Sequence, residues 1–98
     1  MAIGDPIGDG ASVADDATTD ITPDSGSWEI TGLESGQGKA MEVYRTADNG
    51  SNFYLLETLP GGHWDQRTLI VTPTFWLRLK NVSNGSAYNG YSGWVTTE

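Results

Sequence analysis

Apolar and polar side chains alternate between residues 75 and 80, and this is the pattern of a β-strand with one buried face. Two sets of side chains are separated in this way: Phe75, Leu77 and Leu79 on one face, and Trp76, Arg78 and Lys80 on the other. A period of two fits a strand and does not fit a helix. The segment therefore predicts a sheet with one face toward a core and the other toward water or a partner.

Further strands are expected in five other segments, because β-branched and aromatic residues recur between short turn signals. These segments are residues 28–31, 41–46, 53–59, 67–72 and 87–97. The turns contain Asn-Gly pairs at Asn49 and Asn84 and a Pro-Gly-Gly run at Pro60, all of which favour reversal of the chain. Short strands at this spacing predict an all-β fold, with residues 26–98 forming one small antiparallel β-sandwich domain.

The first 25 residues differ in composition from the rest of the chain, since they contain no aromatic residue and few large apolar ones. Such a segment does not bury enough apolar surface to fold alone, so it is expected to form an extended or disordered N-terminal arm, residues 1–25. Its candidate anchors on a partner are Ile3, Ile7, Val13 and Ile21. On this view, deletion of residues 1–25 leaves the sandwich folded and weakens attachment to the partner.

The formal net charge of −8 belongs to the N-terminal part of the chain. Residues 1–35 contain no Lys or Arg, whereas acids and bases balance in residues 36–98. An acidic chain with no basic cluster is not expected to bind nucleic acid or an anionic membrane surface. The acidic arm is instead expected to meet the basic Trp76, Arg78 and Lys80 face, in a neighbouring copy of the chain or another partner, through contacts that weaken in salt.

No catalytic, metal or cofactor site is expected, and the chain is predicted not to be an enzyme. There is no Cys, and the single His63 lies near Asp65 in a Gly-rich loop without the further groups that a triad or a zinc site needs. The run from Asp48 to Asn52 carries oxygen ligands but lacks the spacing of an EF-hand, so it is interpreted as a hairpin turn.

Three interpretations of Trp64 and Trp76 remain open. Both could lie inside the second layer of the sandwich, form a subunit or capsid interface, or form a platform on which sugars stack. Arg78 and Lys80 share the face of Trp76, and this mixture of aromatic and basic groups suits an acidic partner.

Residues 41–98 resemble the second half of a fibronectin type III-like module. The stretch MEVYRTADNGSNFYLLETLPG looks like the central hairpin of that family, and TFWLRLKNVSNGSAYNGYSGWVTTE looks like its last two strands. Phe75 stands where the family usually has its corner Tyr. The resemblance implies an immunoglobulin or fibronectin III-like sandwich, and it allows the alternative function of a glycan-binding or adhesion module.

Residues 26–95 also resemble small structural proteins of tailed-phage virions. The similar stretches are SGSWEITGL, TADNGSNF, LPGGHWDQRTL and TFWLRLKNVSNGS. This resemblance implies a capsid decoration or cement protein that assembles in the host cytoplasm and then sits on the capsid surface. Its partners would be the major capsid protein or another virion protein, and further copies of itself in a homo-oligomer such as a trimer.

Overall fold

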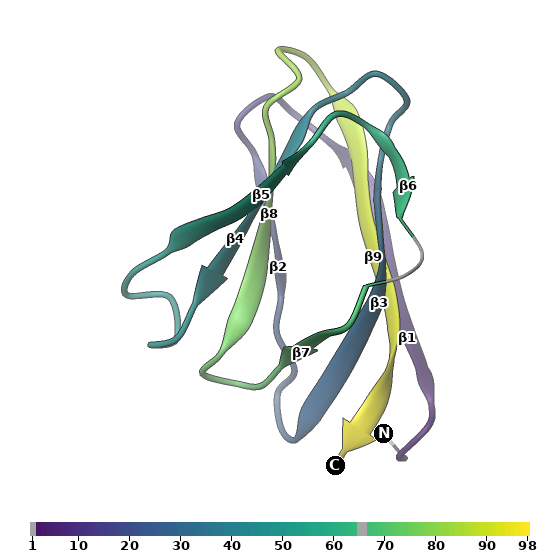
Figure 1. Ribbon diagram of the computed structural model, residues 1–98, viewed down its shortest axis with the longest axis vertical. Coiled ribbons are helices and arrows are strands. Elements are labelled where there is room, and N and C mark those ends of the chain that lie inside the picture. Colours follow the sequence, from purple (N-terminus) through teal and green to yellow (C-terminus); the bar gives the residue numbers. More distant parts are fainter. Residues whose placement is uncertain (1, 65–66) are drawn as a thin grey trace.

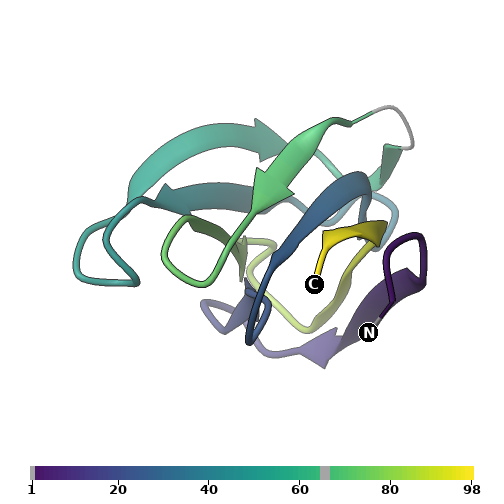
Figure 2. The same ribbon diagram turned by 90° about the horizontal axis from the view of Figure 1, so that it is seen from below.

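The computed structural model describes residues 2–64 and 67–98, which form nine strands in two antiparallel sheets (Figure 1). The strands are β1 (Pro6–Val13), β2 (Thr18–Ile21), β3 (Ser27–Ser35), β4 (Met41–Thr46), β5 (Tyr54–Leu59), β6 (Gly62–Trp64), β7 (Leu69–Val71), β8 (Trp76–Asn81) and β9 (Ala87–Thr97). The two sheets pack as two layers (Figure 2), which confirms the expected all-β class and small β-sandwich. Within the described ranges, no helix is long and apolar enough to span a bilayer.

The strand order is that of a jelly roll. The first sheet has the order β1-β9-β3-β6, with β7 also paired to β3, and the second has the order β2-β8-β4-β5. Among the described strands, only the connections β4 to β5 and β6 to β7 stay within one sheet. An immunoglobulin-type sandwich instead pairs its first strand with its second, whereas crossing between sheets at most connections is typical of jelly rolls. The sandwich is therefore confirmed, but its connectivity is not that of a fibronectin III module.

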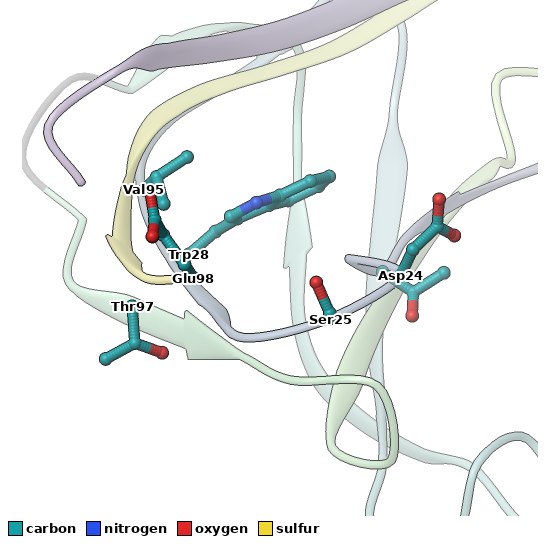
Figure 3. Close-up of a pocket in the computed structure, with 7 residues that line it drawn as sticks. Asp24, Ser25, Trp28, Val95, Thr97 and Glu98 are labelled. Atoms are coloured by element: carbon teal, nitrogen blue, oxygen red, sulfur yellow. The ribbon is translucent and has the colours of Figure 1, made fainter. Parts of the chain in front are cut away.

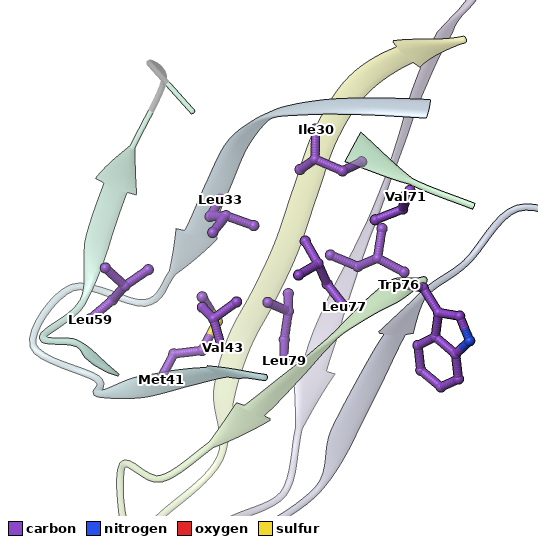
Figure 4. Close-up of a cluster of buried hydrophobic side chains, with 10 residues drawn as sticks. Ile30, Leu33, Met41, Val43, Leu59, Val71, Trp76, Leu77 and Leu79 are labelled. Carbon is purple, nitrogen blue, oxygen red and sulfur yellow. The ribbon is translucent and has the colours of Figure 1, made fainter. Parts of the chain in front are cut away.

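The core lies between the sheets, and the alternation in β8 places its side chains there (Figure 4). Leu77 and Leu79 are wholly buried, as the sequence predicts. Phe75 precedes β8 and is 38% exposed, so it does not belong to this core. The buried cluster consists of Ile21, Ile30, Leu33, Met41, Val43, Leu59, Val71, Trp76, Leu77 and Leu79.

Trp76 is buried even though it points away from Leu77 and Leu79. Its ring meets Phe53 edge-on with the centroids 5.5 Å apart, and its Nε1 donates a hydrogen bond of 3.0 Å to Asn49 Oδ1. The turn before β5 thus folds over this face of β8 and satisfies the polar atom of the indole, as a buried Trp requires.

The expectation of a separate N-terminal arm is wrong, because residues 1–25 supply two strands of the sandwich. β1 pairs with β9 along its whole length, from Pro6 opposite Trp94 to Val13 opposite Ala87. β2 pairs with β8 and buries Ile21 completely. The segment has too few apolar groups to fold alone, but an edge strand needs few of them when its neighbour satisfies its backbone.

Asn81 fastens this N-terminal segment to the rest of the fold. The side chain is wholly buried, and its Nδ2 donates to the carbonyls of Val13, Ala14 and Gly85 at 3.0, 3.1 and 2.8 Å. Its backbone N–H donates to Ala17 O, and its carbonyl accepts from Asp16 N. The turn between β1 and β2 is therefore held by one amide at the end of β8.

Candidate functional site

Arg78 and Lys80 were expected to bind a partner. Both instead form ion pairs with acids of the same chain. Arg78 donates from Nε to Asp20 Oδ1 at 2.6 Å and from Nη2 to Asp20 Oδ2 at 3.1 Å. Lys80 Nζ lies 3.8 Å from Asp16 Oδ1. The hydrogen bond to Asp20 raises the pKa of Arg78 above its usual value. The acidic segment and the basic face do meet, but β8 meets β2 and the turn before it within one molecule, so the expectation of a neighbouring copy is corrected.

The other predicted partner residues are mostly internal. Ile21 and Trp76 belong to the core, and so neither is available to a partner in the folded chain. Ile7 and Trp64 are half-buried and pack against the core, and Val13 is half-buried at the end of β1. Ile3 is the exception, at 64% exposed. The eight candidates therefore do not form one binding surface.

A different set of apolar side chains is exposed along one flank of the sandwich. Arg45 contacts three residues of this flank. It pairs with Tyr54 in the β4–β5 ladder, and its Nη1 donates to Ile70 O at 2.9 Å. Its guanidinium lies 3.8 Å from the centroid of the Phe75 ring. The exposed side chains of this flank, which we call the apolar flank, are Tyr54, Leu55, Leu56, Ile70 and Phe75.

The apolar flank is built on the edges of both sheets. β5 ends the order of the second sheet, and β7 lies at the side of β3 in the first. Tyr54 and Leu55 are 53% and 49% exposed, and they lie next to the register shift between Val43 and Tyr44 in the β4–β5 ladder. The sequence carried a signal for this surface, since the run from Phe53 to Leu56 is apolar on both faces and a half-buried strand should alternate.

His63 lies on the outer face of the first sheet and is hydrogen-bonded to Glu34. Its Nδ1 is 2.6 Å from Glu34 Oε2, because β6 pairs with β3 and puts the two residues opposite each other. Asp65, the expected neighbour of His63, lies outside the described residues. In the parts of the chain that the structure describes, no group of three or more His, Asp or Glu side chains could hold a metal ion.

The carboxylate of Asp48 is used to build the turn before β5. Asn52 donates to it from its backbone N–H and from Nδ2, both at 2.9 Å, and the Thr46 hydroxyl donates at 2.8 Å. These hydrogen bonds, with that of the Asn52 side chain first, lower the pKa of Asp48 to about 2. The residues considered as calcium ligands are thus hydrogen-bonded to each other, as expected of a turn.

A cavity of about 350 Å³ opens at the end of the sandwich where both termini lie (Figures 1 and 3). The Trp28 indole forms one wall, with Val95 beside it, and Asp24 and Glu98 bring carboxylates to the lining. Its chemistry suits a cationic group better than an anionic one.

Comparison with protein-family models finds no match, and comparison with curated protein sequences finds none either. Among solved structures, the chain is similar to the Drosophila NLP-core, whose crystal structure is described as giving insight into pentamer formation and histone binding. The two are 16% identical with a TM-score of 0.44, over 94% of this chain and 99% of that one. A likeness of this size carries no inference about family, partner or assembly.

Proposed function

We propose that this chain is a non-enzymatic structural subunit of a virion, a capsid decoration protein that attaches to the shell through its apolar flank. The observation that carries the proposal is the exposure of Tyr54, Leu55 and Leu56 on an edge strand. Exposed apolar patches of this kind mark surfaces that other proteins cover.

The design of the edges supports attachment at β5 rather than elsewhere. Edge strands are usually protected by Lys, by Pro or by being short. β1 is longer but begins with Pro6, and it carries Asp9. β2 has four residues and one ion-paired acid, Asp20, and β6 and β7 have three residues each. β5 has six residues and contains neither Lys nor Pro. Its pairing with β4 shifts register between Val43 and Tyr44, which is the one irregularity in this ladder. An edge strand that exposes Tyr and Leu side chains fits a protein partner, since such groups supply binding energy when water is excluded.

A decoration protein of this kind would act by adding contact area between neighbouring capsid subunits. Each contact is modest, but symmetry repeats it over the shell and avidity increases the total. Ile21, Trp76 and an N-terminal arm were the expected contacts with the partner. Because Ile21 and Trp76 are buried, the apolar flank takes their place as the expected contact surface.

Co-sedimentation with purified capsids of candidate tailed phages tests this proposal, with the full chain compared to Leu55→Lys. We expect the substitution to reduce occupancy on the capsid at least tenfold, because it places a charge in a contact that must lose its water. The matched control is Thr18→Lys, which adds the same charge to an exposed position on β2 at the opposite edge of the same sheet.

The two variants also separate attachment from self-association. Sedimentation velocity of each protein alone measures the expected homo-oligomer, and capsid binding is measured alongside. The proposal fails if Leu55→Lys binds capsids as the parent does, or if Thr18→Lys loses binding to the same extent.

A further inference from the structure

The outer face of the first sheet is almost free of side chains at its centre. Register places Gly10 opposite Gly90 and Gly8 opposite Ser92, while Gly32 faces Ser92 from the other side. Glycines inside strands often mark places where another group approaches the backbone closely. Three adjacent strands, β1, β9 and β3, thus present only glycine and serine at this place, which we call the glycine floor.

The ring of Tyr88 lies across this floor. A methyl group placed on Gly10 would come within 2.1 Å of the Tyr88 hydroxyl and 2.4 Å of Cζ, and one on Gly90 would come within 3.1 Å of Cε2. The two glycines therefore allow the ring to lie down on the sheet. Tyr88 is still 41% exposed, so the phenol is held in place from below while much of it remains open to water.

Polar groups surround this ring on the side of β3 and β6. Two adjoining depressions, of about 600 and 180 Å³, share three lining residues, Glu34, His63 and Tyr88. Gln37 lines the larger depression and Ser92 the smaller. The side chains of Glu34 and His63 are 41% and 57% exposed, and the contact between His63 Nδ1 and Glu34 Oε2 holds the two side chains together.

From this arrangement we infer that the face binds a neutral saccharide, with Tyr88 as the stacking platform. The apolar face of a sugar ring packs on an aromatic ring, while its hydroxyl groups both donate and accept hydrogen bonds. Carboxylate, imidazole, amide and hydroxyl groups beside one exposed ring match those hydroxyls. The Glu34 carboxylate and the net charge of −8 disfavour phosphate-bearing ligands.

Trp94 supplies a second exposed ring on the same face of β9. It is 39% exposed and lies six residues from Tyr88, a separation of about 20 Å along an extended strand. An oligosaccharide that follows β9 would reach both rings, so longer chains should bind more tightly than short ones. Tyr88, Glu34 and His63 lie on the first sheet, whereas Tyr54, Leu55 and Leu56 of the apolar flank lie on β5 of the second sheet.

NMR titration of the full-length protein with maltohexaose, cellohexaose and N-acetylchitohexaose tests the inference. We expect at least one of them to shift the amide signals of Glu34, His63, Tyr88 and Ser92 at millimolar concentration. Tyr88→Ala should weaken that binding about tenfold or more, whereas Tyr88→Phe should retain it because the ring remains. Gly10→Ala should weaken binding by displacing the ring without removing it.

Tyr54→Ala is the matched control, since it removes an exposed tyrosine from the apolar flank and should leave affinity for the sugar unchanged. Thermal unfolding of each variant checks that it is folded. If Tyr88→Ala does not fold, Gly10→Ala and Tyr88→Phe are compared instead, because they test displacement of the ring against retention of the ring. The inference is overturned if none of the three sugars shifts these signals, if the shifts map to another surface, or if loss of the Tyr88 ring leaves affinity unchanged.

Discussion

At the scale of single residues, Asn81 connects distant parts of the chain. One wholly buried amide serves carbonyls from the β1–β2 turn and from the loop after β8, and its Oδ1 accepts from Ser83 N at 3.0 Å. A buried polar group that loses its hydrogen bonds lowers the free energy of unfolding, so loss of the amide should destabilise the β1–β2 turn as well as β8.

We expect Asn81→Ala to lower the free energy of unfolding by about 3 kcal/mol, because three carbonyls lose their donor and a cavity remains. Urea unfolding followed by tryptophan fluorescence measures the change. Gln37→Ala, an exposed amide in the β3–β4 turn, is the control and should stay within about 0.5 kcal/mol of the parent. Equal effects from the two substitutions would show that Asn81 does not hold the turn.

Asp48 gives the chain a defined response to acid. Its pKa is about 2 in the folded protein, below the ordinary value of 3.8. A carboxyl whose pKa falls on folding stabilises the protein above its unfolded pKa, and that contribution is lost as the pH falls from about 4 to about 2. Asp48→Ala should therefore lose less thermal stability than the parent between pH 5 and pH 2. Melting temperatures across this range test it, and identical pH profiles for the two proteins would contradict it.

At the scale of elements, the N-terminal strands are part of the domain and not an attachment to it. β1 covers one edge of β9, and β2 covers β8 and contributes Ile21 to the core. Removing them would expose the sides of two strands and open the buried cluster to water.

Deletion of residues 1–25 should therefore prevent stable folding, which reverses what the composition of the segment suggests. Far-UV circular dichroism and the dispersion of NMR signals measure this directly. A milder variant, Ile21→Ala, should remain folded but lose about 2–4 kcal/mol of stability. A folded, cooperatively melting protein consisting of residues 26–98 would show that β1 and β2 are dispensable.

At the scale of the whole molecule, the two flanks of the sandwich have different chemistry. The apolar flank lies along β5 and β7, while β1, β2 and the turn between them carry Asp9, Asp15, Asp16 and Asp20. Part of this acidity is neutralised inside the molecule, through Asp20 with Arg78 and Asp16 with Lys80. Asp9 and Asp15 also lie on this side, opposite β5 in the strand order, where their charge keeps that side of the molecule solvated.

The strands after residue 26 could be predicted because their signal is local. Alternation in β8 predicted Leu77 and Leu79 in the core, and the Asn-Gly and Pro-Gly-Gly turns separated most strands at the correct places. Side-chain period and turn chemistry are properties of a few consecutive residues, so they can be recognised without knowledge of the fold. The short strand β6 was missed, because three residues in a Gly-rich stretch show no period.

The role of the N-terminal segment and the position of the exposed surfaces could not be predicted in this way. Arg78 and Asp20 are 58 residues apart in the sequence, and Asn81 reaches a carbonyl 68 residues away. Long-range pairing decides whether a charge faces a partner or an acid of its own chain. The apolar run at Tyr54 was visible, but its exposure depends on β5 being the last strand of its sheet.

By itself, then, the sequence determined that the chain forms a small antiparallel sandwich, because period and turns are local physical properties. The tertiary structure alone decided that residues 1–25 belong to it, that Trp76, Arg78 and Ile21 face inward or pair internally, and that Tyr88 lies on bare glycine. These outcomes depend on which strands become neighbours, and strand order is fixed by the packing of the whole chain and not by any segment of it.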